Sequence, residues 1–383
     1  MKNKKKMVID TSELKNVTDK ILAAVDSSEI STINETLELE VRNSNLYISV
    51  TNREYFVTVK IYLGYEEDLH ASVSANMFLN LISQITTEDI ELTCNENYLH
   101  IKGNGSYKLP LIFDGEKLLT LPKIEIMNPT CSMEIDNSIL QSIAKYNSRE
   151  IAKSQGLVLK PVQKMYYVDS QGAITYTSGA CVNKFTLEKP VKMLLNGKVV
   201  KLFKLFTGES IKFTLGYDAL SNDIIQTKVR FEDAAISLTA ILQCDDTMLD
   251  SVPVTNIRGR AEGVYPYSIT VSKDMFIQAI NRLMIFGNKG VKGSKEIIAH
   301  FTFDKDGVVI TDGRGENLEN VSYTNSCEAL GSEPYSAYLN LNDFKQTLST
   351  CEESHLTLNF GNHQAFVIAR THILNVVPEC EAE

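Results

Sequence analysis

The 383-residue sequence has no tryptophan, no CxxC pair and no run of 18 consecutive apolar residues. The missing apolar run excludes a membrane-spanning helix. The odd count of 7 cysteines, without a CxxC pair, argues against a disulfide scaffold or a zinc site and favours a reducing, cytoplasmic compartment. The first residues, MKNKKKMVID, are basic but are not followed by the apolar core of a signal peptide.

Catalytic and cofactor motifs are also missing. The 6 histidines form no HExxH pattern, and no GxSxG occurs. GNKGVKGSK (287–295) lacks the order of a phosphate-binding loop, and in DKDGVVITDG (304–313) Gly307 comes two positions too early for a calcium loop. We therefore expect no catalytic residue, no metal site and no cofactor, and the protein is not expected to be an enzyme.

What the chain does contain is typical of a soluble globular protein, with 43% hydrophobic and 22% charged residues. Its length predicts two to three domains. The formal charge is acidic, because 38 Lys and Arg stand against 48 Asp and Glu, which gives 38 − 48 = −10.

A pattern that occurs three times is the most informative feature. Three segments begin with a short strand, a polar capping residue and an amphipathic helix; they are MVIDTSELKNVTDKILAAV from Met7, SMEIDNSILQSIAKY from Ser132 and SITVSKDMFIQAINRLMIF from Ser268. The predicted helix caps are Thr11 or Ser12, Asp136 or Asn137, and Ser272. Each helix is followed by strands with apolar residues at every second position, which predicts sheets with one buried face.

A second helix and a second strand pair complete each segment. The second helices are SANMFLNLISQI, LNGKVVKLFKLF and LNLNDFKQTLST. Polar breaks at Thr51, Thr177 and Thr311 recur after 177 − 51 = 126 and 311 − 177 = 134 residues. The predicted fold is α+β, with three domains at 7–127, 128–255 and 264–383, each with two helices on antiparallel sheet, and with joints at MNPTC (127–131) and TNIRGRAEGVYP (255–266).

This layout resembles the bacterial DNA sliding clamp, the beta subunit of DNA polymerase III, over nearly the whole chain. ITYTSGACVNKF (174–185), LNGKVVKLFKL (195–205), MIFGNKGVKG (284–293) and LNVVPE (374–379) match family segments in order, with sparse identities typical of a divergent member. The resemblance implies a head-to-tail homodimer, a six-domain ring of DNA-clamp domains that encircles duplex DNA without sequence specificity. Such a processivity factor in DNA replication tethers the DNA polymerase and is placed on DNA by a clamp loader.

Lysines gather on one side of the helix LNGKVVKLFKLF in spite of the acidic total charge. Lys198, Lys201 and Lys204 span roughly 120° of the helix circumference, and Leu205 lies near their edge. Because Lys and Arg contact phosphates without regard to sequence, we expect these helices to face DNA, although each lysine alone could simply solvate its helix. The candidate DNA-binding residues are Lys15, Lys20, Lys145, Arg149, Lys198, Lys201, Lys204 and Arg282.

The resemblance also implies an apolar groove between the second and third domains, in which partners dock a short peptide. The matching positions are Leu159, Thr177, Gly179, Cys181, Val182, Val291, Asn340, Phe344, Val376, Val377 and Pro378. Ala180 and Cys181 replace the usual His and Arg, so the preferred peptide is expected to differ. Alternatively, these residues are ordinary core at a domain joint.

Ring closure would pair an edge strand of the first domain with the third domain of the next subunit. By position, the resemblance assigns this contact to Tyr107 and Lys108 on one side and to Ile285 and Phe286 on the other. Ile285 and Phe286 could instead belong to the core of their own domain. The competing functions are an enzyme assembled across β-rich repeats and a structural assembly protein that does not bind DNA.

Overall fold

The computed structural model describes residues 6–25, 31–64, 69–147, 165–176, 179–219, 225–242, 246–287, 297–331, 333–370 and 372–381. The chain divides into two compact units, Met1–Ala144 with Asn196–Cys244 and Lys145–Leu195 with Asp245–Glu383. Within the described residues, no helix is long and apolar enough to cross a membrane.

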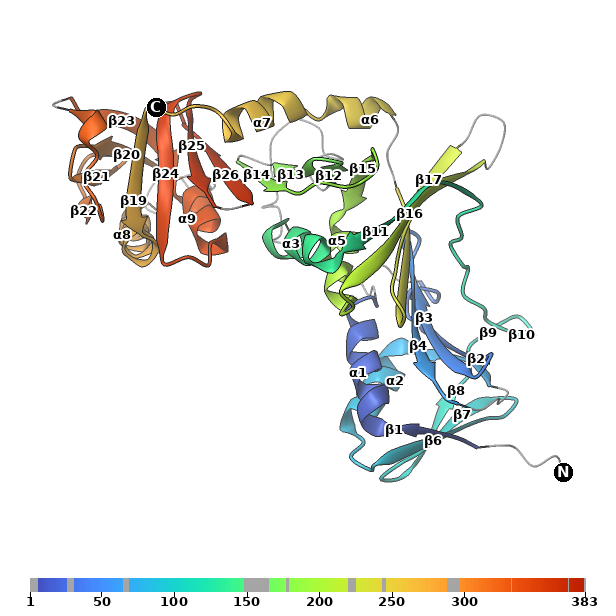
Figure 1. The fold of residues 1–383 in the computed structure, drawn as a ribbon. Coiled ribbons are helices and arrows are strands. Elements are labelled where there is room, and N and C mark those ends of the chain that lie inside the picture. The colour runs from blue at the N-terminus through green and yellow to red at the C-terminus, as the bar shows by residue number, and fades with distance from the viewer. Residues whose placement is uncertain are drawn as a thin grey trace. The chain divides into compact units, whose positions relative to one another are not determined.

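The first unit combines helices with two principal antiparallel sheets (Figure 1). Its helices are α1 (Thr11–Leu22), α2 (Ala75–Gln84), α3 (Asn137–Asn147, which runs on past the unit boundary), α5 (Gly197–Lys201) and the 3₁₀ helix η1 (Leu202–Leu205). Its strands are β1 (Met7–Asp10), β2 (Thr36–Arg42), β3 (Asn45–Thr51), β4 (Tyr55–Tyr62), β5 (His70–Ser74), β6 (Asp89–Cys94), β7 (Tyr98–Lys102), β8 (Ser106–Pro110), β9 (Phe113–Asp114), β10 (Lys117–Leu118), β11 (Asn128–Asp136), β16 (Ser210–Ala219), β17 (Ile225–Glu232) and β18 (Ile236–Ile241).

An eight-stranded sheet in the order β11-β16-β17-β18-β4-β3-β2-β5 organises this unit. Its register places Phe213, Phe231, Leu238 and Val57 opposite one another on neighbouring strands, so they share one face. All four are buried. Helix α1 packs on β3 and β4, and η1 reaches the same face through the contact of Phe203 with Phe231, so the helices cover one side of the sheet (Figure 1).

Six helices begin directly after a strand with a capping side chain, and the pattern repeats through both units. The caps are Asp10, Ser74, Asp136, Asn196, Ser272 and Asn340, which accept from the backbone N–H groups of Glu13, Met77, Ser138, Lys198, Met275 and Asn342. The predictions of Asp136 and Ser272 are confirmed. The prediction of Thr11 or Ser12 is wrong, because Asp10 accepts the bond and Thr11 is the first helical residue.

The second unit is built around another eight-stranded sheet, in the order β15-β12-β13-β14-β26-β25-β24-β19. Its helices are α6 (Asp246–Ser251), α7 (Val254–Ala261), α8 (Lys273–Gly287), α9 (Leu341–Thr350) and the 3₁₀ helix η2 (Glu328–Leu330). Its strands are β12 (Met165–Asp169), β13 (Gly172–Tyr176), β14 (Ala180–Lys184), β15 (Lys192–Asn196), β19 (Tyr267–Ser272), β20 (Ile298–Phe303), β21 (Gly307–Asp312), β22 (Leu318–Ser322), β23 (Tyr335–Asn340), β24 (His355–Asn362), β25 (Ala365–Ala369) and β26 (Ile373–Pro378).

Both faces of this second sheet are covered. Phe366 and Ile368 belong to the aromatic-rich core under α8 and α9, whereas their neighbours Ala365 and Val367 point the other way and are also buried. Helix α7 contacts β14, β25 and β26, and Figure 1 shows it on the side of these strands away from α9. The continuous apolar run of β25 is therefore explained by a sheet enclosed between two helical layers.

The two predicted joints have regular structure. MNPTC enters β11, an edge strand that tolerates Pro129 and has a bulge between Pro129 and Cys131. TNIRGRAEGVYP contains most of α7, although the sequence predicts an interruption there. Only Ile257 and Ala261 of this helix are buried, a stripe too short to stand out in the sequence. The three-domain division itself remains a prediction.

Candidate nucleic-acid interface and peptide groove

The lysine-bearing segment of the first unit forms a short α-helix that tightens into a 3₁₀ turn, α5 and η1. Lys201 is the last residue of α5, and Lys204 lies three residues later in η1. Because positions i and i+3 eclipse each other in a 3₁₀ turn, the two lysines align more closely than an α-helix would allow. Val199, Val200 and Phe203 are fully buried on the opposite side. Leu205, expected near the lysine edge, is also buried because the 3₁₀ turn rotates it toward the sheet.

The three lysines differ in their surroundings. Lys201 and Lys204 are exposed and have no carboxylate partner within the described residues. Lys198 is half-buried, and its Nζ lies 3.9 Å from Oε2 of Glu54. Glu54, which the sequence analysis missed, also accepts a hydrogen bond of 3.2 Å from Asn196 Nδ2. The net positive charge of the segment is therefore concentrated at Lys201 and Lys204.

The other candidate DNA-binding residues differ in whether they have an acidic partner. Lys15 and Lys20 are half-buried on α1 and have no acidic partner in the described part of the chain. The backbone of Lys145 lies in α3, and Arg149 lies outside the described residues. Arg282 on α8 forms two bonds of 2.6 Å to Glu319 of β22, and this hydrogen bonding raises the pKa of the guanidinium. Arg282 therefore already has a carboxylate partner.

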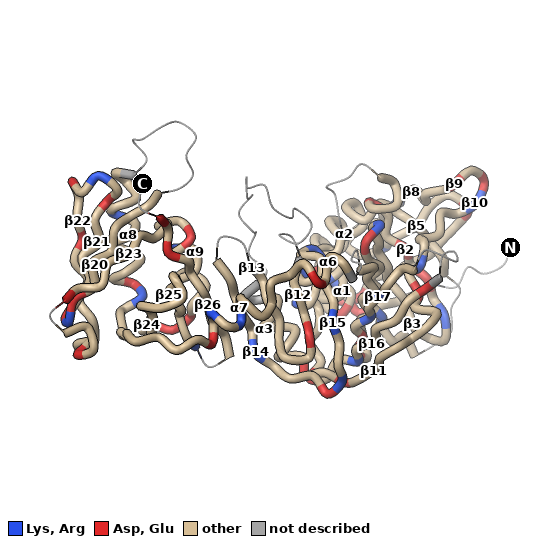
Figure 2. Tube along the Cα trace, turned by 90° about the horizontal axis from the view of Figure 1, so that it is seen from above, with Lys and Arg blue, Asp and Glu red and all other residues tan. Residues whose placement is uncertain are grey.

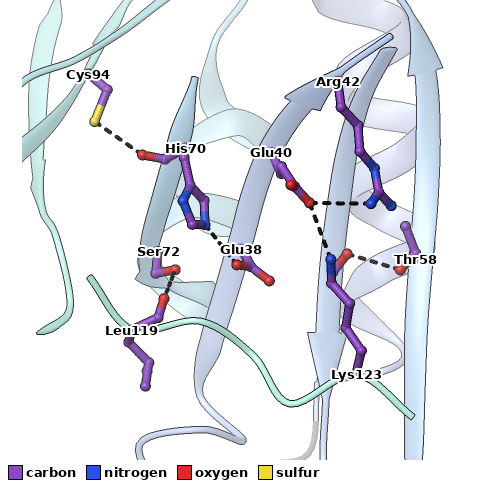
Figure 3. Close-up of polar contacts among 10 residues, drawn as sticks. Glu38, Glu40, Arg42, Thr58, His70, Ser72, Cys94, Leu119 and Lys123 are labelled. Carbon is purple, nitrogen blue, oxygen red and sulfur yellow. Dashed lines mark hydrogen bonds and ion pairs between the residues drawn. The ribbon is translucent and has the colours of Figure 1, made fainter. Parts of the chain in front are cut away.

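The side of the first sheet away from the helices is polar. Glu38 is buried there and its Oε1 lies 2.8 Å from Nε2 of His70, while Glu40 pairs with Arg42 and with Lys123 (Figure 3). The segment that follows β10 crosses this face, where Ser72 Oγ donates to the carbonyl of Leu119 (Figure 3). Figure 2 shows basic and acidic positions interspersed in each unit. The helical side is thus distinguished by Lys201 and Lys204, which have no carboxylate partner among the described residues, and not by a general separation of charge.

The predicted peptide groove is only partly described, because Leu159, Thr177 and Val291 lie outside the described residues. Its remaining strand residues lie on β14 and β26, which pair antiparallel with Ala180 opposite Val376 and Cys181 opposite Asn375. The structure thus brings the two strands together as expected.

These strand residues cannot all line one groove. Cys181 and Val377 point toward the core under α9, and Val182 and Val376 point to the face that α7 covers, since successive side chains alternate along a strand. All four are buried. Burial raises the pKa of the Cys181 thiol to about 12, although Arg370 opposes this shift. A groove lined by all four side chains is therefore wrong for this structure.

Phe344 also does not line the predicted groove. It is fully buried, with its ring 5.6 Å from that of Phe276 and 5.8 Å from that of Phe301. Leu341, Phe344 and Leu348 form the buried stripe of α9, which explains the placement. The alternative interpretation as core holds for Phe344.

Three groove candidates remain at the surface. Gly179, Asn340 and Pro378 are half-buried. A Cβ added to Gly179 would lie 2.7 Å from the carbonyl oxygen of Val376, so only glycine allows this approach of β14 to β26. The side chain of Asn340 caps α9. The candidate groove is thus reduced to the ends of these strands around Gly179 and Pro378.

The candidate subunit contacts lie on one edge strand and at the end of one helix. Tyr107 and Lys108 are on β8, the last strand in the order β1-β6-β7-β8. Ile285 and Phe286 at the end of α8 are 66% and 44% exposed, which contradicts the alternative that they belong to their own core. Leu318, missed from the sequence, is 59% exposed on the edge strand β22, which α8 contacts.

No group of three or more His, Cys, Asp or Glu in the described part of the chain could hold a metal ion. The six described cysteines are all free thiols.

Comparisons with known proteins were made by sequence and by structure. No protein-family model matches the sequence. The curated Beta sliding clamp of Helicobacter pylori strain J99 / ATCC 700824 is 23% identical over 219 residues, which are 52% of this chain and 56% of that protein. The Beta sliding clamp of H. pylori strain ATCC 700392 / 26695 is 22% identical over a stretch of the same length. The chain spans about half the length of the curated relatives it matches.

Solved structures match over nearly the whole chain. The beta subunit of the DNA polymerase of Streptococcus pyogenes has a TM-score of 0.78 at 12% identity and covers 98% of this chain and 100% of its own. The DNA polymerase III beta subunit of Thermotoga maritima has a TM-score of 0.75 at 15% identity, covering 99% and 100%. The H. pylori beta clamp bound to a DNA ligase peptide has a TM-score of 0.71 at 16% identity, covering 98% and 100%. The chain has the sliding-clamp fold, and the resemblance predicted from the sequence is confirmed.

Proposed function

We propose that this chain is a DNA sliding clamp, a non-catalytic processivity factor in DNA replication. Two copies associate head to tail into a ring of six domains, with three per chain at 7–127, 128–255 and 264–383. Duplex DNA passes through the ring without sequence-specific contacts. The protein acts in the cytoplasm.

The observation that carries this proposal is the pair of exposed lysines on α5 and η1. Lys201 and Lys204 project from the side of the segment away from the sheet and have no carboxylate partner within the described residues. Lys15 and Lys20 on α1 of the same unit add two further cations, for which the described part of the chain offers no carboxylate partner. Contacts of this kind with phosphates are salt-labile and allow a protein to move along DNA.

The proposed function implies two partners, a DNA polymerase and a clamp loader, each of which binds the clamp through a short peptide. The peptide of DNA ligase bound to the H. pylori clamp is a precedent for such docking on this fold. In this chain, the surface around Gly179 and Pro378 is the candidate docking site. Because Cys181 is buried, it is not part of the proposed docking surface, which has fewer residues than the sequence predicts.

The size and shape of the particle in solution test the assembly. A closed dimer has a mass of 2 × 42.8 = 85.6 kDa and appears as an annulus in particle images. A compact 42.8 kDa monomer at micromolar concentration would contradict the proposal and favour a structural or enzymatic role.

A further inference from the structure

Helix α7 shapes a polar depression on the face of the second unit's sheet away from α8 and α9. The depression has a volume of about 450 Å³ and is lined by Asn256, Gly259, Arg260, His363 and Gln364. The first three residues come from α7, and the last two form the turn between β24 and β25. Every side chain in this lining carries a hydrogen-bond donor, and Gly259 leaves open space above the helix.

The histidine side of the depression is held in place from several directions. A Cβ at Gly263 would lie 2.6 Å from Nε2 of His363, so glycine is required for the ring to sit there. The ring packs edge-on against Tyr265 at 5.6 Å between centroids, and Tyr265 Oη donates to the carbonyl of Arg260 over 2.6 Å. One aromatic side chain thus joins the histidine to the arginine-bearing turn of α7.

The turn has the backbone of a tight two-residue β-hairpin. His363 and Gln364 both have positive φ, 57° and 49°, as the two central residues of a primed hairpin turn require. The N–H of Glu379 donates to the carbonyl of Gln364, and Asn362 Nδ2 donates to the carbonyl of Val264. These contacts and the hairpin geometry fix where the turn places His363 and Gln364 beside α7.

The charges of the region leave Arg260 as its unpaired cation among the described residues. Arg258, two positions earlier, forms a bidentate pair with Asp169 at 2.7 and 2.8 Å. Glu262 pairs with Lys184 at 2.9 Å. Arg260 is half-buried, and the described residues offer it no carboxylate.

The depression brings together the guanidinium of Arg260, the imidazole of His363 and the side-chain amides of Asn256 and Gln364. We propose that it binds one oxyanion group, a phosphate or a carboxylate. Arginine matches both groups with two parallel N–H donors, and the histidine and amide groups supply further donors from the opposite wall. Within its own unit, the site lies on the side of the sheet away from α8 and α9, and the proposal does not depend on the proposed clamp function.

Titration of the full-length protein with inorganic phosphate and, separately, with acetate tests the proposal. The readout is the NMR signal of the His363 ring in protein labelled at histidine, identified by its loss in His363→Gln. We expect a saturable shift with at least one anion and an affinity about tenfold lower in Arg260→Gln. Stronger binding of phosphate identifies phosphate groups as the natural ligand, and stronger binding of acetate identifies carboxylates.

Two further variants test whether the effect is specific to the guanidinium of Arg260. Arg260→Lys keeps the charge and is expected to bind more tightly than Arg260→Gln, whereas Arg314→Gln, in the exposed turn after β21, leaves the titration unchanged. The absence of a saturable shift with both anions, or equal shifts in Arg260→Gln and the unaltered protein, would overturn the proposal. Because the titration contains no DNA, its failure leaves the clamp proposal to be judged by its own tests.

Discussion

Lys198 lies 3.9 Å from Glu54, between Nζ and Oε2, and so the first lysine of the row on α5 and η1 has an acidic neighbour. Lys201 and Lys204 have none within the described residues. The three positions look equivalent in the sequence but differ in the positive charge that they offer a phosphate. Long-range contacts of this kind decide which of the lysines is available.

Neutralising these lysines is expected to weaken association with DNA unequally. Lys201→Gln with Lys204→Gln should lower the slope of log affinity against log salt by about 1.8, since each lost phosphate contact removes about 0.9. Lys198→Gln should have a smaller effect because Glu54 already offsets its charge. Fluorescence anisotropy with duplex DNA at several salt concentrations measures the slopes.

The matched control carries two neutralised lysines elsewhere on the first unit. Lys117 on β10 and Lys212 on β16 are exposed and lie outside the helical side. Lys117→Gln with Lys212→Gln changes the total charge equally and should leave the slope nearly unchanged. Equal effects of the two double variants would mean that DNA responds only to net charge.

The pair of Arg258 and Asp169 is expected to anchor α7 to the turn between β12 and β13. Burial raises the pKa of Asp169, but the Arg258 guanidinium and the N–H of Gln171 more than offset it, and the pKa lies below its ordinary value. Asp169→Asn should destabilise the unit by about 1–3 kcal/mol at neutral pH, because it leaves Arg258 without its counter-charge. Hydrogen exchange over Val254–Ala261 and thermal unfolding measure this loss.

The pH dependence of this effect follows from the depressed pKa. The stabilisation is fully present above the ordinary aspartate pKa of about 3.9 and is lost as the pH falls through the lower folded-state value. The difference between the unaltered protein and Asp169→Asn should therefore be constant near neutrality and shrink below about pH 4. Glu328→Gln, which breaks the exposed pair with Lys305, is the control and should leave stability nearly unchanged, because solvent screens this pair.

Substitutions at Pro378 and Phe344 are expected to have different effects on the affinity for a partner peptide and on stability. Phe344→Ala leaves a cavity in the core and should cost about 3–5 kcal/mol of stability, with little effect on affinity per folded molecule. Pro378→Ala should keep stability and weaken a docked polymerase peptide several-fold, by calorimetric titration. Unchanged affinity in Pro378→Ala would remove the groove from this end of β26.

The exposed end of α8 is expected to hold the dimer together. Ile285→Asp with Phe286→Asp places two charges on an apolar contact and should convert the 85.6 kDa particle (2 × 42.8) into a 42.8 kDa chain, as measured by light scattering. Met275→Asp, at a 48% exposed position of the same helix, should leave the dimer intact. A dimer that survives both charges at the α8 end would place the subunit contact elsewhere.

Much of the fold could be predicted because local sequence patterns determine its helices and strands. Alternation in β2, β3 and β4 and the polar residue before each helix are short-range signals that tertiary contacts reinforce. The site was less predictable. Cys181 and Val182 are neighbours on β14, so their side chains point to opposite faces of the sheet. The burial of Phe344 depends on packing between α8 and α9. Helix α7 offers only two buried residues, so its existence depends on the apolar strand face beneath it.

Retention on circular DNA tests the central claim most directly. If the protein encloses duplex DNA, complexes assembled on a nicked circular plasmid should stay bound during gel filtration at high salt and be released when the plasmid is cut once. Equal retention before and after cutting, or loss from both forms at high salt, would contradict a topological link.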